Sequence, residues 1–553
     1  MLLRLDRQIG TNFERLLQAA APIVARAAQT RCNEDEYRNQ MPRNSMLDQA
    51  LTRLIAHRSK FPSASRRQHL SCRRTGPGGG AQAKRLPPSS PFPLLSDADA
   101  FGVVCAANGY VKLPDAVGID TDTANATHAQ TTARDRRKRS TPMAKRALIL
   151  IEGSRGNGPL YVQAAQRLGL HPITLAADPA QYDYLAAENS ESIRVDTADL
   201  DALIHKCSQL GATYDIVGIT GFTGLDESGY VTIVKLCQHF GLPGPNLAAI
   251  EQCSDKYTQR KLLAAAGIPI PAYRLAANAT EVESAAAEIG LPVIVKPAEG
   301  SGSTGVRLCR DADEVAEHTK YLLSGAHVWR SSPRILVEEF AQGSFYSADA
   351  MGNTVIAVGA SDFNRPPHFV PCESMFPAPL TDEEYIIIAD VSLSCLRALG
   401  LGWGPANIEF RWTKRGPVVI EVNARLPGWT TPRLIHLAYG VDLVTEHIKL
   451  IIGEECNLRA RHSHTAAARF LVADRNGTLD RIEGTNLAAA VPGVVDVRFY
   501  VEPKAPIVRK GDYRDMIGHV IAASPSGTQT KAILQRAVDL ISWSITPFPT
   551  LDE

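Results

Sequence analysis

The chain has 553 residues, more than one hydrophobic core usually organises, so several domains are expected. Its 44% hydrophobic and 21% charged residues are typical of a soluble globular protein. The ten cysteines form no CxxC pair, which argues against a zinc site and a disulfide framework and favours a cytoplasmic location. No apolar run approaches the length of a membrane span, which argues against a membrane protein.

Residues 1–142 differ in charge and composition from the rest of the chain. They carry 22 Lys and Arg against 12 Asp and Glu, a net charge of +10, whereas residues 143–553 carry a net charge of −9. This stretch offers little apolar surface to offset the entropy of ordering, so we expect a disordered, low-complexity basic extension. The run Arg136–Arg139 raises nucleic-acid binding as an alternative, but no aromatic residues interleave it, which argues against that partner. Met143 directly precedes the first regular segment and could be the true start.

From residue 147 the chain alternates between strand-like and helix-like segments. Strands are expected at Ala147–Ile151, Pro172–Ala176 and Tyr214–Thr220, with a helical pattern after the first and a helix at Tyr230–Phe240 after the third. Such alternation predicts a parallel sheet with helices on its faces.

The following blocks contain further expected elements. A helical pattern covers about 247–266, and strands are expected at Val293–Lys296, Val306–Cys309 and Ile335–Glu339, with a helix near 312–323. Later strands are expected around Thr354–Ala360, Gly404–Trp412 and Pro417–Asn423, and a final helix at Thr530–Ser542.

Two strand-like segments, residues 406–411 and 418–423, are joined by a short turn. If they pair as a hairpin, Glu409 and Glu421 point to the same face, and so does Asn423, because side chains alternate along a strand. Two neighbouring carboxylates repel unless a cation lies between them, and oxygen ligands suit Mg²⁺. A solvated hairpin with ordinary surface acids fits equally well, so this segment alone leaves the metal site open.

Two lysines and a glycine-rich loop precede this hairpin. Lys256 opens a helical segment, and Lys296 ends an apolar strand directly before the loop Glu299–Gly305. A lysine beside backbone amides is suited to a polyphosphate, and glycine lets the N–H groups of a loop approach phosphate oxygens. The loop matches neither GxxxxGK[ST] nor GxGxxG in its usual context, and on its own it could be a hairpin turn.

The order of these motifs resembles that of the ATP-grasp superfamily over about residues 145–525. Six segments carry the resemblance: Asp255-Lys256, Val293-Ile-Val-Lys296-Pro297, the serine- and glycine-rich loop, Leu336-Val-Glu-Glu-Phe340, Asn407-Ile-Glu409 and Glu421-Val-Asn-Ala-Arg425. It implies an α/β and α+β multidomain protein with an ATP-grasp fold. The implied parts are an N-terminal parallel α/β (pre-ATP-grasp) domain at 143–245, a small lid subdomain at 246–345, a large subdomain with the metal site at 346–460, and a C-terminal α+β portion at 461–553.

The resemblance also implies roles for individual residues. Lys256 and Lys296 would contact the ATP phosphates, under a lid formed by Ser301, Gly302, Ser303, Thr304 and Gly305. The backbone of Glu338, Glu339 and Phe340 would read the adenine edge. Glu409, Glu421 and Asn423 would hold Mg²⁺, or Mn²⁺ in its place, and Arg425 would steady the transferring phosphoryl group. Many members of the superfamily carry an acid that contacts the ribose of ATP shortly after the residues that read adenine. The corresponding run here is Gly343-Ser-Phe345, which contains no acid and puts the ribose contact in question.

Within the superfamily, the chain most resembles amino-acid ligases that form dipeptides and related carboxylate–amine ligases with a biotin-carboxylase-like fold. The supporting segments are Arg425-Leu-Pro-Gly428, Thr431-Pro-Arg433 and Tyr513-Arg-Asp-Met-Ile-Gly-His-Val-Ile521. By this resemblance Glu373 would bind the ammonium group of the substrate, although a surface acid fits that position equally well. Gly428 and Arg433 would lie near the substrate, and Arg433 would pair with its carboxylate.

Together these features predict an ATP-dependent ligase that forms carbon–nitrogen bonds. A carboxylate would attack the γ-phosphate to give an acyl phosphate, and an amine would then displace phosphate, with amino acids as the expected small-molecule partners. The alternatives are an ATP-grasp carboxylase that activates bicarbonate and a non-catalytic nucleotide-binding protein, and retention of both lysines and all three proposed metal ligands argues against the second. A homodimer is compatible with the resemblance, and the two substrates are left open.

Overall fold

The computed structural model describes residues 144–222, 228–325, 334–363, 366–428 and 430–549. The predictions for residues 1–142 and for Met143 lie outside this described part of the chain.

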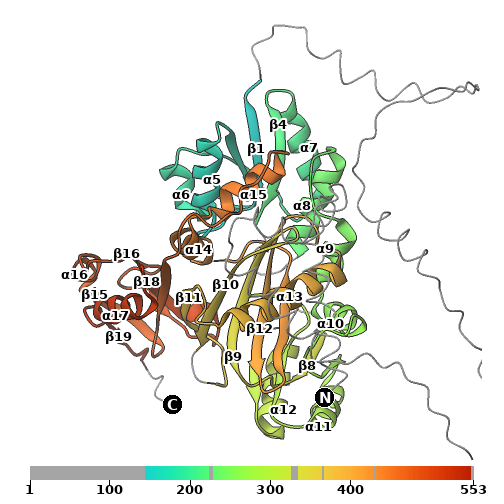
Figure 1. Ribbon diagram of the computed structural model, residues 1–553, viewed down its shortest axis with the longest axis vertical. Coiled ribbons are helices and arrows are strands. Elements are labelled where there is room, and N and C mark those ends of the chain that lie inside the picture. Colours follow the sequence, from blue (N-terminus) through green and yellow to red (C-terminus); the bar gives the residue numbers. More distant parts are fainter. Residues whose placement is uncertain (1–143, 223–227, 326–333, 364–365, 429, 550–553) are drawn as a thin grey trace, which may run out of the picture. The chain divides into compact units, whose positions relative to one another are not determined.

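A four-stranded parallel sheet in the order β3-β2-β1-β4 forms the N-terminal part (Figure 1). Its strands are β1 (Arg146–Ile151), β2 (His171–Ala176), β3 (Glu191–Arg194) and β4 (Asp215–Gly221). The helices are α5 (Gly158–Arg167), α6 (Asp183–Ala187), α7 (Leu200–Gly211) and α8 (Ser228–His239). The predicted parallel sheet is confirmed, but the sequence does not predict β3, because its residues alternate between half-buried and exposed and form no apolar run.

A second sheet has four antiparallel strands in the order β5-β8-β6-β7. They are β5 (Tyr273–Ala276), β6 (Val293–Pro297), β7 (Arg307–Cys309) and β8 (Ile335–Glu339). Helices α11 (Ala279–Ile289) and α12 (Ala312–Leu323) share a hydrophobic core with this sheet. This core fixes the ends of β6 and β8, which carry Lys296 and Glu338.

Helices α9 (Leu247–Ser254) and α10 (Lys256–Ala265) are separated at Asp255. The carboxylate of Asp255 accepts a hydrogen bond from the backbone N–H of Thr258 at 2.6 Å, which begins α10 by satisfying one of its unpaired donors. Lys256 is therefore held in the first turn of a capped helix.

The largest sheet has eight strands in the order β13-β12-β9-β10-β11-β14-β18-β16 (Figure 1). Its strands are β9 (Ser344–Met351), β10 (Thr354–Phe363), β11 (Pro371–Phe376), β12 (Pro405–Thr413), β13 (Gly416–Asn423), β14 (Thr465–Val472), β16 (Val494–Phe499) and β18 (Met516–Ser524). All neighbouring pairs are antiparallel. Residue 460, expected as a domain boundary, therefore lies within the span of one continuous sheet.

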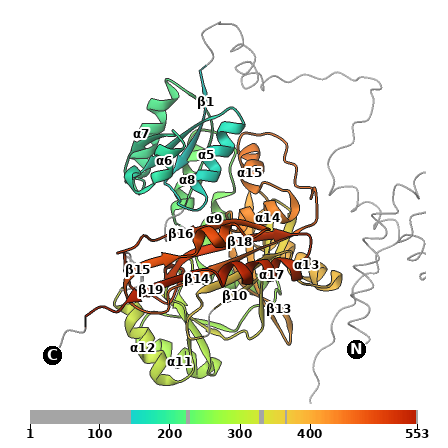
Figure 2. The same ribbon diagram turned by 90° about the vertical axis from the view of Figure 1, so that its left-hand side faces the viewer.

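Helices cover this sheet, and a small sheet follows it. These helices are α13 (Asp382–Leu399), α14 (Thr431–Tyr439), α16 (Thr485–Ala489) and α17 (Gly527–Val538), which packs on β14 and β18 (Figure 2). Helix α15 (Leu443–Ile451) packs instead on α5 and β4 of the N-terminal part. The small sheet contains β15 (Gly477–Glu483), β17 (Pro506–Ile507) and β19 (Ser542–Thr546). The predicted end of the last helix at Ser542 is wrong, because Ser542 pairs with Glu483 and begins β19.

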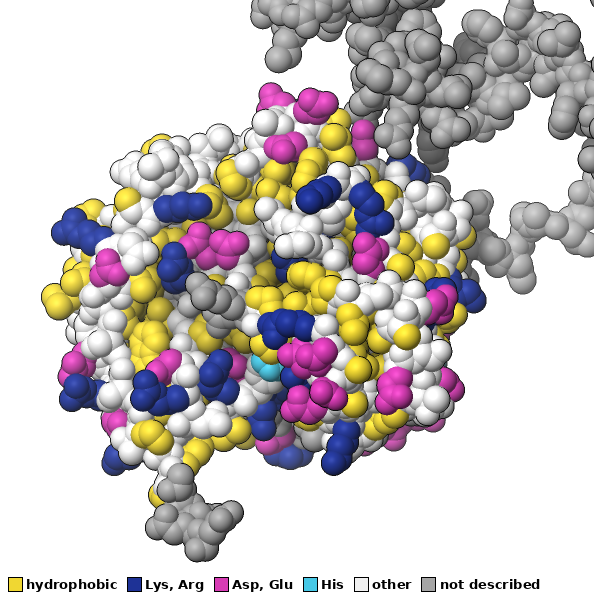
Figure 3. Space-filling model, turned by 90° about the horizontal axis from the view of Figure 1, so that it is seen from below, with side chains coloured by type: hydrophobic (Ala, Val, Ile, Leu, Met, Phe, Trp, Pro, Cys, Tyr) yellow, Lys and Arg dark blue, Asp and Glu magenta, His cyan; other side chains and the backbone are white. Residues whose placement is uncertain are grey.

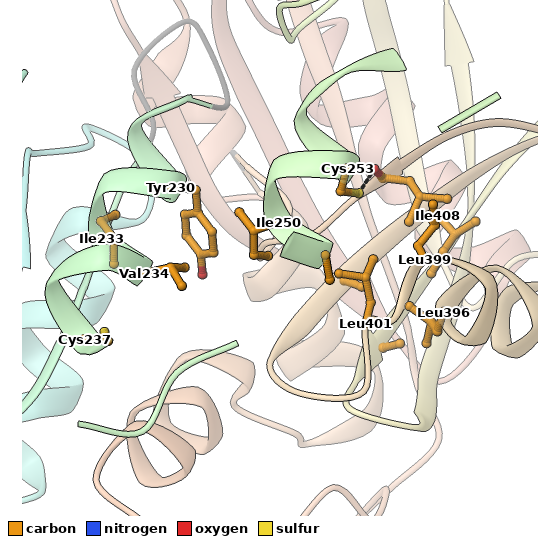
Figure 4. Packing of buried hydrophobic residues seen from close by; sticks show 14 of the residues in the cluster. Tyr230, Ile233, Val234, Cys237, Ile250, Cys253, Leu396, Leu399, Leu401 and Ile408 are labelled. Carbon is orange, nitrogen blue, oxygen red and sulfur yellow. Dashed lines mark hydrogen bonds between the residues drawn. The ribbon is translucent and has the colours of Figure 1, made fainter. Parts of the chain in front are cut away.

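The N-terminal sheet and the large sheet share one hydrophobic core (Figure 4). In this core Tyr230 of α8 faces Ile250 of α9, and Leu399 of α13 lies beside Ile408 of β12. The thiol of Cys253 also donates to the backbone carbonyl of Val422, at 3.1 Å. The core thus continues up to the strand that carries Glu421.

A buried histidine joins α5 to α15. The hydroxyl of Tyr161 lies 2.6 Å from Nδ1 of His447, and both side chains are buried. Burial lowers the pKa of His447 to about 3, whereas an unfolded histidine titrates near 6.5. Folding therefore favours the neutral ring, and this contribution is complete above about pH 6.5 and is lost as the pH falls towards 3.

The variant His447→Gln is expected to lose less stability at low pH than the wild type. Glutamine keeps a hydrogen-bonding partner for Tyr161, but its amide does not titrate between pH 7 and pH 4.5. The wild type should lose roughly 2–3 kcal/mol more of its free energy of unfolding between pH 7 and pH 4.5 than the variant does. Urea unfolding at both pH values measures this difference, with His205→Gln on the exposed face of α7 as control. Equal losses in the wild type and His447→Gln would contradict it.

Acidic and basic side chains are intermixed on the face shown in Figure 3, with apolar side chains between them. Within the described residues, no helix has both the length and the apolar character required to cross a membrane.

Candidate active site

One cavity of about 1630 Å³ is lined by residues of the N-terminal part, of the second sheet with its glycine-rich loop, and of the large sheet with α14. Its walls come from the loop after β1, the ends of β6 and β8, the glycine-rich loop, the β12–β13 hairpin, the start of α14 and the strands β16 and β18. The predicted site residues that line it are Lys256, Lys296, Ser301, Gly302, Ser303, Thr304, Glu338, Glu339, Phe340, Glu409, Glu421, Arg425, Gly428 and Arg433. Residues spread over the 178 positions from Lys256 to Arg433 thus line one cavity.

The β12–β13 hairpin places its two glutamates directly opposite each other. Glu409 pairs with Glu421 in the register, and Asn407 pairs with Asn423. Burial and then the charge of Glu421 raise the pKa of Glu409 above its ordinary value. For Glu421, burial opposes ionisation, but the positive charges of Lys256 and Lys296 outweigh it and lower the pKa. The hairpin therefore holds one firmly ionised carboxylate beside one whose charge is not fully compensated.

This donor set fits a divalent cation. Carboxylate oxygens are hard ligands of the kind that Mg²⁺ prefers, and a cation between Glu409 and Glu421 would remove the repulsion that raises the pKa of Glu409. Asn423 lies with Nδ2 at 3.5 Å from Oε1 of Glu409, so its amide can support that carboxylate. Asn423 itself is buried and does not line the cavity.

The two lysines are held by the acids around them. Nζ of Lys256 lies 3.0 Å from Oε1 of Glu421, and it also donates to the backbone carbonyl of Gly300 in the glycine-rich loop. Nζ of Lys296 lies 2.6 Å from Oε2 of Glu338. Both ammonium groups therefore stand at fixed positions in the cavity wall, one beside the acidic hairpin and one at the end of β8.

Arg260 is a further residue of the site that the sequence does not identify. Its guanidinium is fully buried, with Nε at 2.6 Å from Oε1 of Glu338, and it donates to the carbonyl of Ile420 beside Glu421. Glu338 thus receives one cation on each of its oxygens. The available signal was spacing, because Arg260 lies four residues after Lys256 and hence on the same face of α10.

The glycine-rich loop meets the C-terminal part of the chain. Gly302 has φ of +65°, and a Cβ there would lie 2.5 Å from Cδ1 of Tyr513. Thr304 is buried, and its hydroxyl has no hydrogen-bond partner among the described residues. A hydroxyl without a partner beside two lysines fits a phosphate oxygen as ligand.

An arginine surrounded by phenylalanine rings forms another wall of the cavity. The guanidinium carbon of Arg411 lies 5.3 Å, 5.6 Å and 5.8 Å from the ring centres of Phe345, Phe363 and Phe369. Phe345, the last residue of the run Gly343-Ser-Phe345, also lines the cavity, so a ring and not a carboxylate lies at this position.

Besides Asn423, two predicted site residues do not line the cavity. Glu373 lies opposite Arg469 on the neighbouring strand, and its Oε2 is 2.6 Å from Nη2 of that arginine. Ser374, the next residue along β11, lines the cavity and Glu373 does not, which argues against the expected ammonium contact of Glu373. Gly305, at the end of the loop, does not line the cavity either.

The opposite wall contains polar residues that the sequence does not single out. Asp496 and Arg498 of β16, Tyr500 just after it, and His519 of β18 all line the cavity near Arg433. His519 lies in the segment Tyr513–Ile521 that supports the resemblance, but no short motif marks the others. Only the alternation of polar residues at 496, 498 and 500 could have indicated a shared face.

The sequence is similar to known proteins over most of the described part. Residues 255–459 match the family described as "Carbamoyl-phosphate synthase L chain, ATP binding domain", and residues 469–546 match "L-amino acid ligase C-terminal domain 2". The uncharacterised protein y4rH of Sinorhizobium fredii is 59% identical over 409 residues, which cover 74% of this chain and 85% of that protein.

The chain belongs to the ATP-grasp superfamily. Among the relatives of this ATP-grasp enzyme, human carnosine synthase 1 is 28% identical over 54% of this chain and 39% of its own length. The D-alanine–D-alanine ligase of Nitrosospira multiformis is 26% identical over 52% of this chain and 93% of its own. The enzyme class is that of ATP-dependent ligases that form carbon–nitrogen bonds.

Solved structures confirm the fold of the ATP-grasp enzyme. The L-amino acid ligase of Bacillus licheniformis superposes with a TM-score of 0.62 at 20% identity, covering 73% of this chain and all of that one. The biotin carboxylase domain of Hydrogenobacter thermophilus 2-oxoglutarate carboxylase, solved with MgADP and bicarbonate, superposes with a TM-score of 0.55 at 19% identity, over 73% and 92% of the two chains. At these identities the likeness concerns the fold alone.

Proposed function

We propose that this ATP-grasp enzyme joins an amino acid to an amine, with amino acids as the preferred substrates, through an acyl-phosphate intermediate. The observation that carries the proposal is the arrangement of Lys256, Lys296, Glu409 and Glu421 around one cavity beside the glycine-rich loop. Phosphoryl transfer depends on positioning and on charge compensation more than on a covalent nucleophile, and these residues supply both.

In the first step an oxygen of the substrate carboxylate attacks the γ-phosphorus of ATP. An O–P bond forms, the bond from the γ-phosphorus to the bridging oxygen breaks, and ADP leaves. Lys256 and Lys296 bind phosphate oxygens, and Arg425, which lines the same cavity, faces the charge that develops on the transferred group. Glu409 and Glu421 would hold Mg²⁺, which would compensate phosphate charge there, and Asn423 supports the carboxylate of Glu409.

In the second step the nitrogen of the amine attacks the acyl carbon. A C–N bond forms, the C–O bond to phosphate breaks, phosphate leaves and the nitrogen loses a proton. The glycine-rich loop shields the acyl phosphate, which would otherwise react with water.

None of the seven described cysteines forms a disulfide bond, which fits a reducing cytoplasm.

The same ATP site would also serve a carboxylase that activates bicarbonate, and biotin carboxylases are among the relatives, at 25–26% identity. We therefore propose a phosphate-release screen with the full chain, using pairs of amino acids in one arm, and bicarbonate with biotin in the other. Phosphate release that depends on an amino acid, together with a dipeptide detected by mass spectrometry, is the expected result. Release only with bicarbonate and biotin would overturn the proposal.

Trapping with hydroxylamine tests the intermediate itself. Hydroxylamine is a small nucleophile that converts an acyl phosphate into a hydroxamate, so ATP, one amino acid and hydroxylamine should give the amino-acid hydroxamate and ADP in equal amounts. Dipeptide formation with AMP in place of ADP would contradict the acyl-phosphate route.

A further inference from the structure

Four polar side chains from three elements are linked in the cavity wall opposite the lysines. Oδ2 of Asp496 lies 2.7 Å from Nη1 of Arg433 and 3.0 Å from Nε2 of His519. The hydroxyl of Tyr500 lies 2.6 Å from Nδ1 of the same histidine. All four residues line the cavity, and none belongs to the ATP-binding set described above.

The arrangement fixes the direction of the Asp496 carboxylate. A tyrosine hydroxyl that donates to Nδ1 leaves the ring proton on Nε2, which then donates to Asp496. His519 is only 5% exposed, so its ring is held by packing as well as by these two bonds. Both bonds to Asp496 end on Oδ2, and within the described residues no side chain is bonded to Oδ1.

The partner of Asp496 also has unused donors. Arg433 donates through Nη1 alone among the described residues, and its side chain is 37% exposed. The planar guanidinium can therefore present a second N–H pair to a carboxylate. Arg498, two residues after Asp496 on the same face of β16, adds positive charge to this wall.

A carboxylate oxygen and a guanidinium edge side by side match the two charges of a zwitterion. An α-amino acid carries an ammonium group and a carboxylate on one carbon, so one molecule can bind Oδ1 of Asp496 and the outer N–H groups of Arg433 together. Arg433 lies eight residues after Arg425, in the helix that begins beside Gly428. Arg425, Arg433 and Asp496 line one cavity, so the zwitterion would bind in the same cavity as the phosphoryl group that is transferred.

We propose that Asp496 and Arg433 form the subsite for the amino acid that supplies the amine, with His519 and Tyr500 as positioning residues. The inference rests on the proposed ligase function and names its second substrate as a zwitterionic α-amino acid. Asp496 takes the role that the sequence assigns to Glu373, whose carboxylate is occupied by Arg469 outside the cavity.

The test compares two reactions of the full chain carrying Asp496→Asn. Hydroxamate formation from ATP, the first amino acid and hydroxylamine bypasses the amine subsite, and it is expected to stay within about threefold of the wild type. In dipeptide synthesis at a saturating first amino acid, the KM for the amine-supplying amino acid is expected to rise about 10- to 100-fold, as for the loss of a hydrogen bond to a charged group. An unchanged KM, or equal loss of both reactions, would overturn the inference.

Further variants separate binding from structure. Tyr500→Phe should raise the same KM about threefold to tenfold without lowering hydroxamate formation, because it leaves Asp496 in place but frees His519. Arg433→Gln should abolish the preference for a free amino acid over its amide, since the amide lacks the carboxylate that Arg433 binds. A preference that survives in Arg433→Gln would overturn the carboxylate half of the inference.

Two acid-to-amide changes serve as comparisons. Asp178→Asn removes an aspartate that is paired with Arg194 on the exposed surface, outside the cavity, and should change neither reaction. Glu373→Gln tests the residue that the sequence assigns to the ammonium group. If the KM for the amine-supplying amino acid rose in this variant and not in Asp496→Asn, the assignment to Asp496 would be wrong.

Direct binding separates this inference from the proposed function. Calorimetric titration of the amino acid into wild type and Asp496→Asn, without ATP, should show binding to the wild type that is weakened at least tenfold in the variant. If the wild type forms no hydroxamate with any amino acid, the proposed function fails, whereas equal affinity of the two proteins for the amino acid refutes the subsite.

Discussion

Replacing Glu421 with glutamine is expected to lower the rate of ADP formation at least about 100-fold, because the carboxylate is both the partner of Lys256 and one of two proposed ligands of the metal. The change removes a charge but keeps the size of the side chain. The pKa of Glu409 should fall at the same time, since part of its elevation comes from the neighbouring negative charge. The measurement is single-turnover ADP formation over a range of Mg²⁺ concentrations.

The control for this variant is Glu454→Gln, the same chemical change at an exposed glutamate 3.9 Å from Arg146 and away from the cavity. It should retain the wild-type rate. If Glu421→Gln also turned over at the wild-type rate, with unchanged dependence on Mg²⁺, the assignment of the acidic hairpin to the metal would be wrong.

Replacing Glu338 with glutamine is expected to destabilise the fold by about 3–5 kcal/mol. The carboxylate lies between Lys296 and Arg260, which are both buried, and its removal leaves two buried cations without a counter-charge. Burial and the charge of Arg260 already lower the pKa of Lys296, so loss of Glu338 should lower it further and favour the neutral amine. Chemical denaturation at pH 7 measures the change in unfolding free energy.

The next residue along β8 provides a matched control. Glu339 pairs with Arg415 at 2.7 Å, but that arginine is 59% exposed, so Glu339→Gln should cost less than about 1 kcal/mol. A similar loss of unfolding free energy in the two variants would show that the contacts of Glu338 with Lys296 and Arg260 do not stabilise the sheet β5-β8-β6-β7.

The acidic hairpin could be predicted because its evidence is local. A period of two places Glu421 and Asn423 on one face. The register that starts at the turn would put Glu409 opposite Ile420, and a shift in register between Glu409 and Phe410 brings it opposite Glu421. The ends of β6 and β8 were likewise predictable from apolar runs that stop at Lys296 and Glu338. Together with Lys256 and the glycine-rich loop, these segments carry the residues that we propose to bind ATP.

In the half of the cavity that we propose to bind the amine, the resemblance indicated only Gly428 and Arg433, because the other residues join them only through tertiary structure. Arg433 and Asp496 are 63 positions apart, and they meet because β16 joins the edge of the large sheet next to β18. For Glu373 the resemblance indicated the position but no strand was predicted there, and the contacts of its side chain depend on pairing with β14, whose residue Arg469 is 96 positions away. A shift of one residue decides whether a side chain enters the cavity, and sequence patterns do not resolve that shift.

The continuity of the eight-stranded sheet limits how such enzymes can be recombined. The segment from residue 469 onward matches a family of its own, which invites its exchange between relatives as a specificity module. In this chain the joint is the ladder between β11 and β14, where Glu373 and Arg469 lie directly opposite each other. A chimera that slips this ladder by one residue would turn the grafted strands over and present their apolar faces to the amino acid. The Glu373–Arg469 pair is therefore a part to transplant together with any grafted C-terminal segment.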